Sequence, residues 1–212
     1  MRLLLIPVIL TVIAISGCVS DQVIPLDSVE ITNYEGEQLT PITSIRDVSI
    51  AGPQNISISE YRLEVIGLVN EPKSYTYDEV LSNQKYSKVV TINCVLGWSS
   101  KNLWEGVLVK DVIGDVSSEA NTVIFHAHDG YTTSHPLDYI RDNNILLAYK
   151  VNNVTLTPKL GYPFMLVAEE KWGYKWIKWI TKIELSNDPD YRGYWEQRGY
   201  SIEGDIDGSF YG

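Results

Sequence analysis

The sequence predicts a single α+β domain that follows an export signal and a tether. Short apolar runs that alternate like strands are mixed with apolar stretches of only one to three helical turns. The chain has no regular strand–helix–strand rhythm and no glycine-rich phosphate fingerprint, so a doubly wound nucleotide-binding fold is not expected. With 212 residues, it is long enough for one domain with one sizeable core.

The N-terminus reads as a lipoprotein signal. Arg2 supplies the positive start, residues 3–15 are almost wholly apolar, and Ile15-Ser16-Gly17-Cys18 resembles a lipobox. The apolar stretch is shorter than the roughly 20 residues of a membrane-spanning helix, which favours cleavage over an uncleaved signal anchor. We therefore expect residues 1–17 to be a signal peptide, Cys18 to be lipidated, residues 18–58 to be a tether and lead-in, and residues 59–212 to be the domain. This predicts an extracytoplasmic protein anchored to the membrane by lipid.

The domain opens with a predicted strand and a short helix. Residues 61–69 alternate in polarity like a strand, and Asn70-Glu71-Pro72 follows as a turn. Thr76 can cap a helix that runs to Leu81. Residues 88–93 form the next predicted strand and lead directly to Cys94, while Trp104-Glu105-Gly106 is expected to start a helix at 107–113.

The second half alternates in the same way. Strands are predicted at 121–127, 145–151, 164–168 and 179–185, and Pro136 suits the first position of a helix that ends at Arg141. Residues 187–212 are rich in Asp, Gly and Tyr and are expected to wrap around the domain.

The charge and the cysteine count exclude some classes of partner and cofactor. The formal net charge is −10 at pH 7, and no basic stripe is present, so we expect no nucleic-acid partner. The two cysteines are too few to ligate an iron–sulfur cluster.

Cys94 is the most informative residue. Because Cys18 is assigned to the lipobox, Cys94 has no internal partner for a disulfide. From residue type alone it can be a buried structural thiol, a nucleophile with a histidine partner, or a thiolate ligand to a metal. A zinc site formed by Cys94, His126 and His128, as in a hydrolase, is a further alternative, although the spacing matches no usual zinc motif.

A second cluster lies at residues 170–180. It contains three lysines, three tryptophans and Gly173, which makes it locally cationic in an acidic chain. Lysines and loop amides beside a glycine suit an anionic phosphate, and a solvated lysine face over an aromatic core is the structural alternative.

Four blocks of the sequence, in order, resemble the molybdopterin-binding domain of the sulfite oxidase superfamily, including its protein-methionine-sulfoxide reductase branch. The blocks are residues 63–72; the cysteine block at 93–99 with 104–107; Asp129-Gly130-Tyr131 and its continuation to 137 with 147–149; and 161–167 with 172–180.

This resemblance implies a mixed fold of several small sheets and short helices, with a molybdenum–molybdopterin cofactor. By analogy with the family, Cys94 would be the metal ligand. Gly173, Lys175 and Lys178 would hold the pterin phosphate, with Lys178 as its direct partner, and Asn93, Asp129 and Gly130 would line the cofactor pocket. Tyr131 and His128 are weaker candidates for substrate contacts, and for His128 a structural role is equally compatible with the sequence.

The chain also departs from the family. None of its arginines lies inside the matched blocks, and Leu96 stands where the family often has an acidic residue. The sequence thus predicts a tethered oxidoreductase, or its cofactor-binding subunit, that transfers oxygen atoms with a sulfite- or sulfoxide-type substrate. Its electrons would be exchanged with a separate partner, such as a cytochrome or a quinone-linked membrane protein. A metal-free lipoprotein binding module with the same fold is the alternative.

Overall fold

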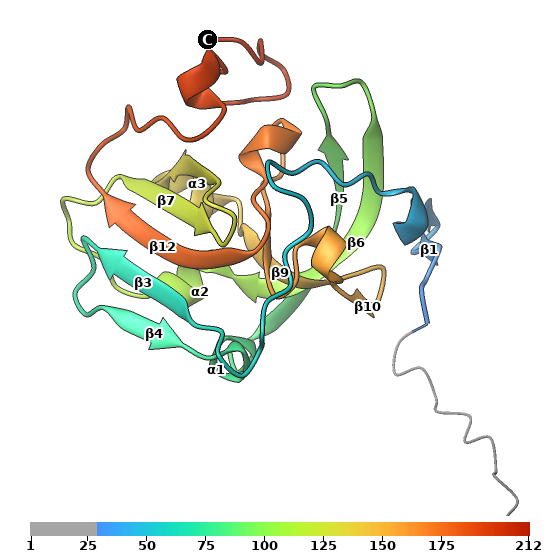
Figure 1. Ribbon diagram of the computed structural model, residues 1–212, viewed down its shortest axis with the longest axis horizontal. Helices are drawn as coiled ribbons and strands as arrows, with labels where there is room; N and C mark the ends of the chain where they lie inside the picture. Colours follow the sequence, from blue (N-terminus) through green and yellow to red (C-terminus); the bar gives the residue numbers. More distant parts are fainter. Residues whose placement is uncertain (1–28) are drawn as a thin grey trace, which may run out of the picture.

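The computed structural model describes residues 29–212, so the predicted signal peptide and Cys18 lie outside the described residues. Two five-stranded sheets and a small hairpin carry most of the regular structure (Figure 1). The elements, in chain order, are β1 (Asn33–Tyr34), β2 (Glu37–Gln38), η1 (Ile42–Ser44), β3 (Leu63–Gly67), β4 (Lys73–Tyr75), α1 (Tyr77–Leu81), β5 (Lys85–Asn93), β6 (Ser99–Leu108), α2 (Val109–Ile113), β7 (Thr122–Ala127), β8 (Thr132–Pro136), α3 (Leu137–Asp142), β9 (Leu146–Val151), β10 (Val154–Thr155), η2 (Pro158–Leu160), β11 (Met165–Val167), η3 (Gly173–Lys175), β12 (Ile180–Ser186) and η4 (Glu196–Arg198).

The first sheet is antiparallel and has the order β10-β9-β6-β5, with β11 also paired to β9. Its longest unit is the β5–β6 hairpin, in which Lys85 pairs with Val107 and Asn93 pairs with Ser99. The turn of this hairpin contains Cys94, so the hairpin carries the thiol to one end of the sheet.

The second sheet has the order β4-β3-β12-β7-β8. β12 pairs parallel with β3 and antiparallel with β7, which makes the last strand of the chain the central strand of this sheet. In Figure 1, β12 lies between β3 and β7, and the C-terminal tail continues from its end.

One apolar cluster joins the two sheets. It includes Val65 of β3, Val107 of β6, Phe125 of β7, Leu147 of β9 and Ile183 of β12, all fully buried. Each such side chain contributes about 1.5–3 kcal/mol by leaving water. The predicted α+β class, with several small sheets and short helices, is confirmed.

Local sequence signals explain most helix starts. Thr76 caps α1 in a capping box: its hydroxyl oxygen accepts a bond from the Glu79 amide, and the Glu79 carboxylate accepts one from the Thr76 amide. α3 begins at Leu137, so Pro136 is its N-cap rather than its first residue.

The predicted helix at 107–113 is partly wrong. Residues 104–108 belong to β6, and the helix α2 begins only at Val109. Gly106 lies against β9 so closely that a Cβ there would approach the Leu147 carbonyl oxygen to 2.4 Å. Tertiary pairing with β5 and β9 therefore extends the strand past the point where the local pattern predicted a helix. The strand β8 was not predicted.

Segments outside the two sheets cover one end of the domain. The lead-in packs Ile45 into the core, and the C-terminal tail (residues 187–212) runs beside β8 and η3. Among residues 29–212, no helix is long and apolar enough to cross a membrane.

Candidate functional site

A cavity of about 190 Å³ opens beside the turn that contains Cys94. Most of its walls come from five separated segments of the chain: the lead-in at 45–50, the β5–β6 hairpin, the β7–β8 turn, the loop from Gly173 to Trp179, and the tail; Leu160 and Met165 complete the lining. The walls are mainly apolar and aromatic, with a few charged groups, as in many small-molecule sites.

The turn after β5 presents Cys94 to this pocket. The Cys94 amide donates to the Trp98 carbonyl, and the Gly97 amide donates to the Cys94 carbonyl, both at 2.9 Å. Gly97 has φ +81°, a left-handed conformation that glycine adopts without strain. The thiol is 8% exposed and lines the cavity. Of the three options that the sequence left open, a purely structural thiol fits this placement least, because the side chain lines a cavity.

Gly173 lies next to Cys94 because the two loops pair. Asn93 forms a parallel bridge with Trp172, and a Cβ on Gly173 would approach the Asn93 carbonyl oxygen to 3.2 Å and the Cys94 Cα to 3.6 Å. Glycine therefore allows the loop at 172–175 to pack directly against the cysteine turn.

Lys178 supplies a cationic group to the same pocket. Its amino group donates to the Asp47 carboxylate at 2.7 Å and to the Lys159 carbonyl at 3.2 Å, and it lies 5.2 Å from the centre of the Trp179 ring. The side chain is 14% exposed. Burial lowers the pKa of Lys178, and the neighbouring Asp47 opposes that shift by favouring the charged form.

The turn after β7 brings Asp129 and Tyr131 to the pocket. Asp129 accepts a bond from the Tyr131 amide at 3.0 Å, and the Tyr131 hydroxyl donates to the Tyr174 carbonyl. Burial raises the pKa of Tyr131 well above its ordinary value, and the nearby carboxylate of Glu196 adds to this effect. Tyr131 is thus held as a neutral phenol.

Lys175 does not face the pocket, although the resemblance assigned it to the pterin phosphate. Its side chain is fully buried, and its amino group donates to Glu196 at 2.8 Å and to the Ile202 carbonyl at 2.7 Å. It is not among the residues that line the pocket. The backbone between the two lysines turns their side chains apart, so the structure leaves Lys178 as the lysine of this cluster that faces the cavity.

Three further predicted residues also lie outside the lining. Asn93 contributes backbone contacts to the loop at 172–173, Gly130 is exposed in the β7–β8 turn with φ +85°, and His128 is exposed with its amide donating to Trp179. These positions shape the turns that carry Cys94 and Asp129.

The structure adds lining residues that the sequence patterns missed. Arg46 comes from the lead-in, and Trp195 and Tyr200 come from the tail. Neither segment carries a recognisable motif, and only the tertiary structure brings them to the cavity. Burial raises the pKa of Tyr200, with smaller contributions from Tyr211 and Cys94.

The zinc alternative is not supported by the geometry. His126 bonds Glu184 of β12 at 2.9 Å, and burial lowers its pKa. Within the part of the chain that the structure describes, no three His, Cys, Asp or Glu side chains are grouped to hold a metal.

The donor set suits a soft metal whose other ligands come with a cofactor. A lone thiol is a soft ligand, and one thiolate alone does not complete a coordination sphere. Lys178 can neutralise an anionic arm of the same cofactor, and Gly173 lines the pocket where its loop packs closely on the cysteine turn. The Trp98 indole nitrogen, on a side chain that lines the pocket, is a further buried donor with no partner among residues 29–212.

Comparison with known proteins gives a consistent result. The family model for the oxidoreductase molybdopterin binding domain matches residues 50–195. The chain is 35% identical over 156 residues to the uncharacterized oxidoreductase YuiH of Bacillus subtilis, a match that covers 72% of this chain and 78% of YuiH.

Two further proteins, less similar to this chain, have the same kind of domain. The putative protein-methionine-sulfoxide reductase subunit YedZ1 of Azospira oryzae is 31% identical over 150 residues, which covers 70% of this chain and 57% of that protein. Among solved structures, the sulfane dehydrogenase SoxCD of Paracoccus pantotrophus has a similar fold, with a TM-score of 0.64 at 20% identity over 72% of this chain and 43% of that one. The chain thus spans only about half the length of these two proteins.

Proposed function

Because this chain belongs to the oxidoreductase molybdopterin binding domain family, we propose that it is a molybdenum-dependent oxidoreductase that acts on a sulfur-containing substrate. The observation that carries this proposal is the convergence of Cys94, Gly173 and Lys178 on one pocket, although they lie on two loops some 80 residues apart in the sequence. The family implies a molybdenum–molybdopterin cofactor, and the donors at the pocket fit that group.

Each residue has a defined part in this proposal. Cys94 would be the thiolate ligand to molybdenum, and Lys178 would bind the pterin phosphate. Gly173 would let the loop approach the cofactor, and Asp129 and Tyr131 would position it from the opposite turn. When bound, the cofactor supplies two-electron oxygen-atom transfer. The mainly apolar walls would favour displacement of water by the cofactor, and the Tyr131 phenol remains protonated as a hydrogen-bond donor.

The electrons would be exchanged with a separate protein. Relatives with this domain are named as subunits, including the protein-methionine-sulfoxide reductase catalytic subunit MsrP of Campylobacter jejuni. We propose a cytochrome or a quinone-linked membrane protein as the partner, with the present chain held at the extracytoplasmic face of the cell membrane by a lipid on Cys18. Lipid labelling that persists in Cys18→Ser would refute the anchor.

The test of the function is the content of molybdenum and pterin. The full chain is produced in a host that makes molybdopterin, and metal and pterin are quantified in the wild type and in Cys94→Ser. We expect about one molybdenum per chain in the wild type and its loss in Cys94→Ser. Cys18→Ser is the matched control, because it removes the other cysteine and should leave the metal content unchanged. Metal-free wild-type protein with an intact fold would instead identify a binding module.

A further inference from the structure

Two aromatic side chains of the C-terminal tail line the pocket. Trp195 is the last residue of the family match, and Tyr200 lies beyond it. Their rings pack on each other with centroids 5.2 Å apart, and Tyr200 also packs on Tyr174 at 5.0 Å. Part of the pocket wall is therefore supplied by a segment that the family model does not include.

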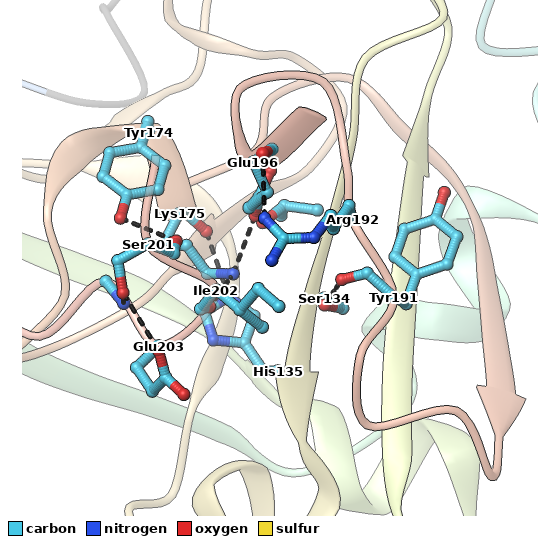
Figure 2. A network of polar contacts seen from close by, with 12 residues as sticks. Ser134, His135, Tyr174, Lys175, Tyr191, Arg192, Glu196, Ser201, Ile202 and Glu203 are labelled. Atoms are coloured by element: carbon cyan, nitrogen blue, oxygen red, sulfur yellow. Dashed lines mark hydrogen bonds and ion pairs between the residues drawn. The ribbon is translucent and has the colours of Figure 1, made fainter. Parts of the chain in front are cut away.

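A buried ion pair holds this wall in place. Lys175 and Glu196 are both fully buried, and Lys175 also donates to the Ile202 carbonyl. Thr133 of β8 donates to the same Glu196 oxygen at 2.8 Å. Figure 2 shows Lys175 between Glu196 and Ile202, so that its amino group ties down the chain on both sides of Tyr200.

Contacts further along the tail complete the attachment. The Tyr174 hydroxyl donates to the Ser201 carbonyl at 2.9 Å, and the Trp172 amide donates to the Gly204 carbonyl at 2.8 Å. Lys171 forms an ion pair with Asp205. Because the loop at 171–175 also packs against Cys94, the tail is fixed directly to the structure that carries the reactive centre.

The charges around the pocket do not favour a small anion. Lys178 pairs with Asp47 and is the group that the proposed function gives to the cofactor phosphate. The other two charged groups of the lining, Arg46 and Asp129, have opposite charges, and the chain as a whole is strongly acidic. The aromatic rings offer apolar surface and polarisable faces instead, which suits an uncharged molecule with small alkyl groups.

We propose that the tail is the substrate-selecting wall of this enzyme, and that Trp195 and Tyr200 restrict the pocket beside Cys94 to small uncharged sulfoxides. The proposal rests on the function proposed above. In the reaction, two electrons and two protons convert the sulfoxide to a thioether and water; in the assay, two equivalents of a reduced one-electron dye supply the electrons.

The first test compares substrates of different size. The full enzyme, Trp195→Ala and Tyr200→Ala are assayed with dimethyl sulfoxide, methyl phenyl sulfoxide and sulfite. We expect each variant to raise the ratio of kcat/KM for the phenyl over the dimethyl substrate about tenfold, with molybdenum content unchanged. Tyr191→Ala is the matched control, since Tyr191 is an aromatic residue of the tail that does not line the pocket. Unchanged ratios at full metal content, or a wild type that prefers sulfite, would overturn the proposal.

The second test does not depend on the metal. In a Cys18→Ser background Cys94 is the sole thiol, and its rate of reaction with a bulky maleimide is measured in protein made without molybdopterin. Tyr200→Ala should raise this rate about tenfold while Tyr191→Ala leaves it unchanged, with circular dichroism confirming the fold. Equal rates would show that the tail does not guard the thiol. If instead the wild type never contains molybdenum but the rates differ as expected, the proposed function fails and the wall itself stands.

Discussion

Replacing Lys175 with methionine should lower the free energy of unfolding more than removing a lysine from the surface would. Lys175→Met replaces the stem with an unbranched apolar side chain of nearly the same length and removes the amino group. Glu196, whose side chain is fully buried, then loses its cationic partner and keeps only the Thr133 hydroxyl. Removing one member of a buried ion pair costs about 3–5 kcal/mol, because the remaining charge is left without compensation.

The size of the effect can be measured by urea unfolding and by calorimetry. For a domain of this length, each kcal/mol lowers Tm by about 2–4 °C, so the expected drop is about 6–20 °C. The double variant Lys175→Met/Glu196→Gln removes both charges and keeps the acceptor for Thr133. It should be more stable than Lys175→Met alone by about 2 kcal/mol.

Two outcomes would refute this reasoning. A loss below about 1 kcal/mol in Lys175→Met would mean that the pair contributes no more than an exposed salt bridge. Additive losses in the two single variants and the double variant would mean that the two residues do not interact energetically. The exposed pair Lys101–Glu37 is the control, and Lys101→Met should change stability little.

Four further results are expected. Lys178→Glu should abolish pterin retention in dialysed protein, because a repulsive charge would face the phosphate; normal retention would place this lysine outside the cofactor site. Asp47→Asn should act in the opposite sense and tighten phosphate binding up to about fivefold in calorimetry, since it frees the Lys178 amino group; weaker binding would instead assign Asp47 a positioning role. Burial and the nearby Lys175 hold the pKa of fully buried His135 well below its ordinary value. As the pH drops below about 6.5 the unfolded chain therefore binds a proton before the folded protein does, and the free energy of unfolding should fall by up to about 1.4 kcal/mol per pH unit. His135→Gln should flatten that slope in urea titrations, and an unchanged slope would contradict the assignment. Gly106→Ala should cost several kcal/mol, because its Cβ would collide with the β9 backbone; a Tm close to that of the wild type would show that the strands can separate freely.

Local signals in the sequence predicted much of the fold. Thr76 and Glu79 form the capping box that starts α1, and the alternating runs became β3, β5, β7, β9 and β12. The failure at 104–108 has a physical cause: those residues gain more by pairing with two neighbouring strands than by starting a helix, and Gly106 is there to admit the close approach of β9. Such pairing cannot be read from a local window.

The residues of the candidate site that lie in sequence motifs were predictable, and those brought in by tertiary packing were not. Cys94, Gly173 and Lys178 sit in motifs, and the structure brings them to one pocket. The resemblance assigned both Lys175 and Lys178 to the phosphate and favoured Lys178 as its direct partner. The ion pair that buries Lys175 against Glu196 could not be predicted from the local sequence. Arg46 and Tyr200 reach the pocket from segments without a pattern, so no reading of the sequence could place them.

The position of β12 has a consequence for the order in which the chain can fold. β12 is the central strand of its sheet and the last strand made, and it joins two hairpins, β3–β4 and β7–β8, that have no direct pairing with each other. Until residues 180–186 arrive, one edge of each hairpin is unpaired and open to association with other chains. The sheet therefore closes in a late step over long sequence separations, which is intrinsically slow. A chaperone that shields these edges would act in the interval before β12 is inserted.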